Sequence, residues 1–171
     1  MNKQPIRLAW LNYAHSQHTG YAYNSSTIIE NGEGQIAGTI GEMAFLRWLE
    51  DLNIDFEYCA KTSYDYDFIV NGYRIDVKTK KSKGAPRDYY TVRIPEAQKR
   101  QKCDLYVFIY ITDHDAYFLG YAEKSEYWDV IGFPVKKGEK TDNFIEKVDA
   151  QVAYIRDLVD MDRLDIVLSD F

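Results

Sequence analysis

The sequence DFIVNGYRIDVK, residues 67–78, decides the fold of this chain. Two short apolar runs, residues 68–70 and 73–78, flank the dipeptide Asn71-Gly72. Asn-Gly favours the positive backbone φ angles of a type I′ turn, which joins two antiparallel strands without spare residues. We therefore predict a β-hairpin whose register is set by its turn.

Side chains alternate between the two faces of the second predicted strand. Ile75 and Val77 fall on one face, which this pattern predicts to be buried. Arg74, Asp76 and Lys78 fall on the other face. An exposed edge strand with solvated charges would give the same pattern. Burial of an Asp–Lys pair contributes little to stability, so a functional role for Asp76 and Lys78 is favoured.

Asp67 opens the first strand of the hairpin, where its carboxylate can approach that of Asp76. Two close carboxylates repel each other, and a divalent cation relieves that repulsion. Hard oxygen ligands suit Mg²⁺ or Mn²⁺ rather than zinc. With the ammonium of Lys78 nearby, this pattern suits phosphodiester hydrolysis. Asp65 competes with Asp67 for the place of the first acid, and a turn-capping Asp67 is the other alternative.

Residues 34–52 carry apolar side chains at helical spacing and predict the strongest helix of the chain, packed against a sheet. Glu42 lies on or beside the apolar face of this helix, where a carboxylate needs a partner. Gly38 and Gly41 leave room for close approach of another backbone. A solvent-facing Glu42 at the edge of the apolar stripe fits the pattern too.

The other patterns predict shorter elements around this hairpin and helix. Strands are expected at residues 56–59, 89–94, 105–111 and 117–121, helical segments at 6–14, 95–102 and 123–130, a loop at 136–142, and a strand or helix within 152–171. Together they predict a single α/β domain with a mixed central sheet of about four or five strands. The helix at residues 34–52 would cover one side of the sheet and a shorter helix the other.

Charge is distributed unevenly along the chain, whose formal net charge is -6. Residues 74–102 contain ten basic and three acidic side chains, a local +7, so the remainder carries -13. An acidic protein can in this way keep an electropositive face for nucleic acid. The expected phosphate contacts, with a merely solvated loop as the alternative, are Lys80, Lys81, Lys83, Arg87 and Lys99.

Composition excludes several other classes of protein. Cys59 and Cys103 are too few for a disulfide framework or an iron–sulfur cluster. No apolar run is long enough for a membrane span, and the N-terminus lacks a signal-peptide pattern, so we expect a cytoplasmic protein with no membrane partner. Tyrosines near the hairpin could stack on unpaired bases or pack in the core and rim; these are Tyr64, Tyr66, Tyr89 and Tyr90.

The ordered set of helix Glu42, strand-start Asp67 and the Asp76-Val77-Lys78 triplet resembles the PD-(D/E)XK nuclease superfamily, also called restriction-endonuclease-like. The resemblance covers about residues 34–121, within a single domain of residues 1–171 that has N- and C-terminal elaborations. Tyr66 replaces the proline of the family name. The resemblance implies a restriction-endonuclease-like fold.

The resemblance also implies a role for each site residue. Asp67, Asp76 and the backbone carbonyl of Val77 would bind the metal, and Lys78 would assist the attacking water. Glu42 would hold a metal-bound water or a second ion. Gln98 resembles an accessory glutamine that some members place on the following helix, although an exposed helical glutamine fits equally well.

The function expected from this resemblance is Mg²⁺-dependent hydrolysis of DNA phosphodiester bonds, as an endonuclease, with Mn²⁺ able to substitute. A homodimer would be natural for paired cuts in duplex DNA. The alternative is a catalytically silent nucleic-acid-binding or assembly protein with the same fold.

Overall fold

Strand β6 (Leu105–Ile111) lies between two apolar cores, and all seven of its side chains are buried. Its odd-numbered aliphatic side chains face one core, and its three even-numbered aromatic side chains face the other. The structure is a computed structural model that describes residues 1–18, 33–141 and 144–169. The continuously apolar sequence of β6 is therefore the signature of a strand covered on both sides.

β6 belongs to a mixed six-stranded sheet in the order β1-β7-β6-β4-β3-β2. β4 and β6 run parallel, and the other neighbours pair antiparallel. The predicted mixed α/β fold is confirmed, but the expected four or five strands are wrong, because the short polar β1 shows no strand pattern. The other strands are β1 (Lys3–Pro5), β2 (Glu57–Tyr58), β3 (Phe68–Val70), β4 (Tyr73–Lys81) and β7 (Asp115–Glu123).

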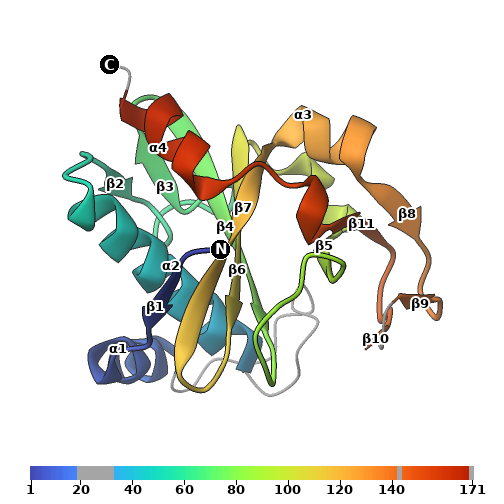
Figure 1. Ribbon diagram of the computed structural model, residues 1–171, viewed down its shortest axis with the longest axis horizontal. Helices are drawn as coiled ribbons and strands as arrows, with labels where there is room; N and C mark the ends of the chain where they lie inside the picture. Colours follow the sequence, from blue (N-terminus) through green and yellow to red (C-terminus); the bar gives the residue numbers. More distant parts are fainter. Residues whose placement is uncertain (19–32, 142–143, 170–171) are drawn as a thin grey trace.

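Three helices cover one face of this sheet: α1 (Leu8–His18), α2 (Glu33–Asp51) and α4 (Met161–Ser169). Their apolar side chains enter the core that the odd-numbered side chains of β6 face. Phe45 of α2 and Leu164 of α4 are fully buried there. Figure 1 shows α1 and α2 side by side along the sheet, with α4 near its upper end. Among the described residues, no helix is long and apolar enough to cross a membrane.

The opposite face is covered by a second, three-stranded sheet in the order β5-β11-β8, rather than by the shorter helix that was expected. Within residues 95–102 only Glu96–Arg100 are helical, as a short 3-10 segment, η1, because Pro95 and Gln101 on either side of it are extended. The ambiguous tail contains both a strand and a helix. The elements on this side are β5 (Thr91–Pro95), η1 (Glu96–Arg100), α3 (Lys124–Glu126), η2 (Tyr127–Ile131), β8 (Phe133–Val135), β9 (Lys140–Thr141), β10 (Phe144–Ile145), β11 (Ala150–Tyr154) and η3 (Ile155–Asp157).

The predicted hairpin is confirmed. Asn71 and Gly72 have φ angles of 47° and 85°, and the register places Val70 opposite Tyr73. β4 has nine residues whereas β3 has three, so β4 pairs with β3 only up to Ile75. Beyond that point the edge of β4 that faces away from β6 is left to side chains from other segments.

A buried ion pair joins β5 to the segment after β10. Arg93 Nη1 lies 2.9 Å from Glu146 Oε1, and both side chains are almost inaccessible. We expect Glu146→Ala to lower the free energy of unfolding by about 3–5 kcal/mol, because it strands a buried guanidinium. As the control, Glu96→Ala removes one partner of an exposed ion pair with Lys136 and should cost less than about 1 kcal/mol. Urea unfolding of the two variants measures both, and equal losses would contradict the prediction.

Candidate active site

The free edge of β4 is capped by Asp67. Asp67 Oδ2 accepts a hydrogen bond from the Val77 N–H at 2.7 Å, and the Asp67 N–H donates to the Ile75 carbonyl at 2.9 Å. The carbonyl of a strand residue points to the same edge as its N–H, so the Val77 carbonyl faces this side as well. Asp65, the competing candidate, is held in the preceding turn by a bond from its N–H to Ser63 Oγ. The structure therefore brings Asp67, and not Asp65, against the D-x-K strand.

Helix α2 approaches β4 closely at Gly41, next to Glu42. A Cβ added to Gly41 would lie 1.9 Å from Thr79 Oγ1, so the glycine allows the helix to pack directly on a side chain of the strand, rather than on another backbone as expected. Glu42 does not face solvent: its Oε2 accepts a hydrogen bond of 2.5 Å from the Tyr58 hydroxyl. Tyr58, from β2, is a contact of the candidate site that the sequence pattern did not single out.

This close approach gives a matched pair of variants. We expect Gly41→Ala to destabilise the fold by about 1–3 kcal/mol and to move Glu42, because the new methyl group overlaps Thr79. Gly38→Ala, one turn earlier, meets only the Glu42 carboxylate at 4.0 Å and should gain up to about 1 kcal/mol from helix propensity. Thermal unfolding of both variants tests the difference, and a stable Gly41→Ala protein would refute the direct packing of α2 on β4.

Three carboxylates share one electrostatic environment at this edge. Burial raises the pKa of Asp67 well above its ordinary value, the charges of Asp76 and Glu42 add to that effect, and the Val77 N–H and Lys78 oppose it. Burial also raises the pKa of Glu42; the hydrogen bond from Tyr58 opposes this, and the charge of Asp76 adds to it. The charges of Asp76 and Glu42 therefore disfavour a negative charge on Asp67, and the charge of Asp76 disfavours one on Glu42.

Asp76 and Lys78 lie on the aromatic face of the sheet, opposite Ile75 and Val77, as the alternation predicted. Asp76 is only 5% exposed, and Lys78 Nζ lies 2.5 Å from its Oδ2. Lys78 Nζ also lies 5.7 Å from the centre of the Tyr106 ring. This burial rules out the solvated edge strand that the sequence had left open.

Two glutamines from the segment after β5 hold the ammonium of Lys78. Lys78 Nζ donates to Gln98 Oε1 at 2.8 Å and to Gln101 Oε1 at 3.1 Å. Gln98 is the accessory residue expected from the sequence, whereas Gln101 was missed. Gln101 is 7% exposed, and its Nε2 donates to the Tyr64 carbonyl at 2.9 Å. The only signal available was the i, i+3 spacing of two glutamines after the D-x-K strand.

The donor set fits a hard divalent cation in its chemistry. The candidate ligands are carboxylate and carbonyl oxygens, and the buried Asp76 Oδ2 has no hydrogen-bond partner, although Lys78 lies beside it. In the described part of the chain, no three His, Cys, Asp or Glu side chains are grouped so that they could hold a metal ion. The expected ligand set does not require three such side chains in direct contact with the metal. It consists of two carboxylates, the Val77 carbonyl and Glu42 acting through a water.

The basic side chains of residues 74–102 differ in their exposure and in their partners. Arg74 is paired with Asp104 at 2.7 Å and Arg93 with Glu146, so these two contribute little to an electropositive surface. Lys80 follows Lys78 on the same face of β4, and its Nζ donates to the Tyr110 hydroxyl at 3.0 Å. The remaining expected phosphate contacts are exposed; these are Lys81, Lys83, Arg87 and Lys99.

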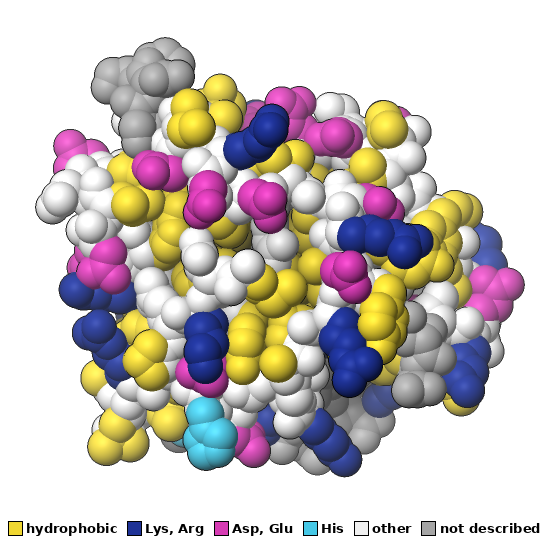
Figure 2. Space-filling view, in the orientation of Figure 1, with side chains coloured by type: hydrophobic (Ala, Val, Ile, Leu, Met, Phe, Trp, Pro, Cys, Tyr) yellow, Lys and Arg dark blue, Asp and Glu magenta, His cyan; other side chains and the backbone are white. Residues whose placement is uncertain are grey.

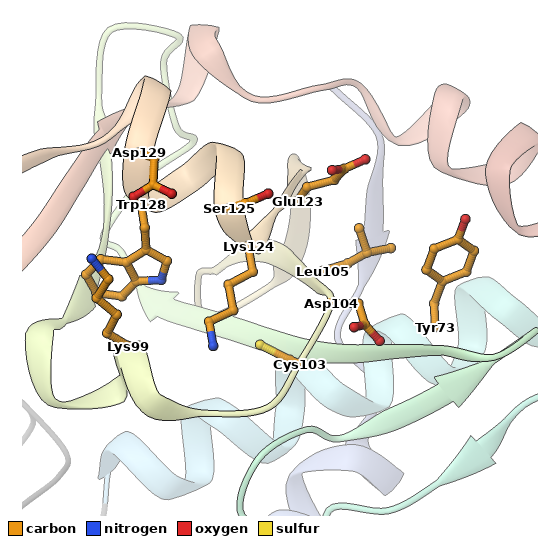
Figure 3. Close-up of a pocket in the computed structure, with 10 residues that line it drawn as sticks. All are labelled: Tyr73, Lys99, Cys103, Asp104, Leu105, Glu123, Lys124, Ser125, Trp128 and Asp129. Atoms are coloured by element: carbon orange, nitrogen blue, oxygen red, sulfur yellow. The ribbon is translucent and has the colours of Figure 1, made fainter.

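A cavity of about 540 Å³ lies between η1, the start of β6 and the α3–η2 segment. Among the candidate site residues only Lys99 lines it, with Nζ 5.3 Å from the centre of the Trp128 ring (Figure 3). Figure 3 also shows Lys124 extending across the cavity, and its ammonium donates to the Gln101 carbonyl. Its lining combines basic and acidic side chains, so it does not resemble a dedicated phosphate pocket.

Comparison with known proteins finds no matching family model, no matching curated protein and no matching solved structure. The comparisons therefore neither support nor exclude the resemblance to PD-(D/E)XK nucleases.

Proposed function

We propose that this chain is a metal-dependent nuclease of the PD-(D/E)XK type that hydrolyses DNA phosphodiester bonds as an endonuclease. The observation that carries the proposal is the placement of three carboxylates around one lysine at the free edge of β4: Asp76 is buried against Lys78, Asp67 bonds to the intervening Val77 N–H, and the half-buried Glu42 adds to the raised pKa of Asp67. Such a group destabilises the fold, so its presence favours a function that uses it. A divalent cation is the species that would offset all three charges.

Each residue has a separate part in the proposed reaction. Asp67, Asp76 and the Val77 carbonyl would hold Mg²⁺, with Mn²⁺ able to substitute, and Glu42 would hold a water bound to it or a second ion. When bound, the metal polarises the scissile phosphoryl group and lowers the pKa of a coordinated water. Lys78 would orient the attacking water and offset the negative charge that develops on the oxygens of the scissile phosphate.

The surrounding contacts keep these groups in place. Gln98 and Gln101 accept hydrogen bonds from the Lys78 ammonium, and the Val77 N–H donates one to the Asp67 carboxylate. Pre-oriented groups avoid the cost of reorganisation when the phosphate arrives. The proposed function thus relies on rigid positioning by β4 and η1.

DNA as the substrate is supported by the exposed cations near the site. In the view of Figure 2, most of the acidic side chains lie in the upper half, and most of the Lys and Arg side chains lie in the lower half. A polyanion would be attracted to the lower half and repelled from the upper, and that attraction would weaken steeply with salt. We expect Lys83 and Arg87, in the loop after β4, to contribute to binding.

The decisive experiment incubates the full chain with plasmid, linear duplex, single-stranded and branched DNA, with Mg²⁺, with Mn²⁺ or with EDTA. Cleavage that needs a metal and disappears in Asp76→Ala and Lys78→Ala variants supports the proposal. Cleavage that persists in both variants would place the site elsewhere. Salt-sensitive DNA binding without any cleavage would favour the alternative, a catalytically silent nucleic-acid-binding protein.

The loop after β4 supports a smaller, separate prediction. We expect a Lys83→Ala, Arg87→Ala double variant to bind DNA more weakly and to reduce the slope of log affinity against log salt by up to about two, since each phosphate contact adds about 0.9 to it. Both side chains are exposed, so stability should not change. Fluorescence anisotropy from 50 to 200 mM salt measures the slope, with Lys140→Ala on β9 as an exposed control. An unchanged slope would exclude this loop from the interface.

A further inference from the structure

The turn that precedes Asp67 contains an aromatic ring outside the cores. Tyr64 is 70% exposed, whereas the ring of Tyr66, two residues later, packs against the aromatic core. The same turn is held by bonds from the Thr62 and Ser63 N–H groups to the Cys59 carbonyl at 2.8 Å. The backbone at Tyr64 is therefore fixed, while its ring contributes no core packing.

The Gln101 side chain connects the backbone carbonyl of Tyr64 to Lys78. The Gln101 amide donates to the Tyr64 carbonyl at 2.9 Å and accepts from Lys78 Nζ at 3.1 Å. The Gln101 side chain is 7% exposed, so both ends of the amide are committed to these contacts. The Tyr64 backbone is thereby held one side chain away from the lysine that would meet the scissile phosphate.

We propose that Tyr64 stacks on an unpaired base next to the scissile phosphate, so that the preferred substrate has a single-stranded, gapped or frayed nucleotide at the site. This inference rests on the proposed function. A base offers its face to an aromatic side chain only when it is unstacked from its neighbour. A ring that is exposed, and whose backbone carbonyl is linked to Lys78 through Gln101, meets that requirement without a large pocket.

The test compares three side chains at position 64 on two substrates. Tyr64→Leu keeps an apolar group without a π face, and Tyr64→Phe keeps the ring. We expect Tyr64→Leu to raise KM for a single-stranded oligonucleotide about tenfold with little change in kcat, because stacking on one aromatic side chain contributes that order of affinity. Tyr64→Phe should stay within about twofold of the wild type. On a blunt duplex of the same sequence, both variants should match the wild type.

A fluorescence measurement reports base stacking directly. A single-stranded oligonucleotide that carries the fluorescent base 2-aminopurine should be quenched when the wild type or Tyr64→Phe binds it, and not when Tyr64→Leu does. Unchanged quenching and KM in Tyr64→Leu would overturn the proposal, as would an equal loss on the blunt duplex.

The design separates this proposal from the proposed function. Because Tyr64 is exposed, all variants should keep the wild-type unfolding temperature. A wild type that cleaves DNA but does not depend on the ring defeats only the stacking proposal. A wild type that cleaves no DNA defeats the proposed function, and the quenching arm then still decides whether Tyr64 binds a base.

Discussion

An Asp67→Asn variant is expected to lose DNA cleavage by about 10³-fold while remaining folded. The amide oxygen of Asn can still accept the hydrogen bond from the Val77 N–H, so the edge of β4 keeps its cap. The lost negative charge removes a ligand on which the proposed metal site depends. Because burial and the charges of Asp76 and Glu42 disfavour that charge in the free protein, unfolding in EDTA should occur at an equal or higher temperature.

The same variant reports metal binding without relying on activity. Mg²⁺ or Mn²⁺ should raise the unfolding temperature of the wild type, because a ligand that binds only the folded state stabilises it. That increase should vanish in Asp67→Asn. Asp65→Asn is the matched control, since its backbone belongs to the preceding turn, and it should keep both cleavage and the metal effect. Equal responses of the two variants would remove Asp67 from the site.

A Lys78→Met variant is expected to lose cleavage by about 10²–10³-fold and, unlike Asp67→Asn, to lose stability. Met has a similar length and no charge, so it leaves the Asp76 carboxylate buried without its counter-charge beside Asp67 and Glu42. Removal of one partner of a buried pair costs about 3–5 kcal/mol. Urea unfolding in EDTA measures this loss, and single-turnover cleavage measures the catalytic effect.

Two companion variants interpret the Lys78→Met result. Adding Asp76→Asn removes the stranded charge and should restore most of the stability without restoring cleavage. Lys80→Ala removes the next lysine on the same face of β4 and should leave cleavage within about tenfold of the wild type, since Lys80 would contribute only to phosphate attraction. If Lys80→Ala loses as much cleavage as Lys78→Met, general positive charge rather than a specific lysine explains the activity.

Local patterns predicted the parts of the fold that depend on local chemistry. Asn71-Gly72 favours positive φ angles, and strand alternation follows from backbone geometry, so the hairpin and the two faces of β4 were readable. The spacing that placed Glu42 beside the apolar stripe also held, because α2 is a regular helix packed on one side. These features need no knowledge of distant segments.

Features that depend on distant segments were not predictable from local patterns. A strand was predicted at residues 89–94, but its partner could not be: β5 pairs with β11, more than fifty residues later, to form a second sheet. Tyr58 and Gln101 likewise reach Glu42 and Lys78 only after β2 and η1 are in place. Apart from the i, i+3 spacing of Gln98 and Gln101, their own sequence neighbourhoods do not distinguish them from ordinary surface residues.

Segments from near the two ends of the sequence both pair with β7. β1 pairs with residues 115–117, and further along the same strand Tyr121 forms an antiparallel bridge with Val159. β7 is therefore not an edge strand: the three-residue β1 is the outermost strand on this side of the sheet, and very short edge strands offer little backbone to a second molecule. Removal of residues 1–7 would expose the much longer β7 and would favour self-association through it.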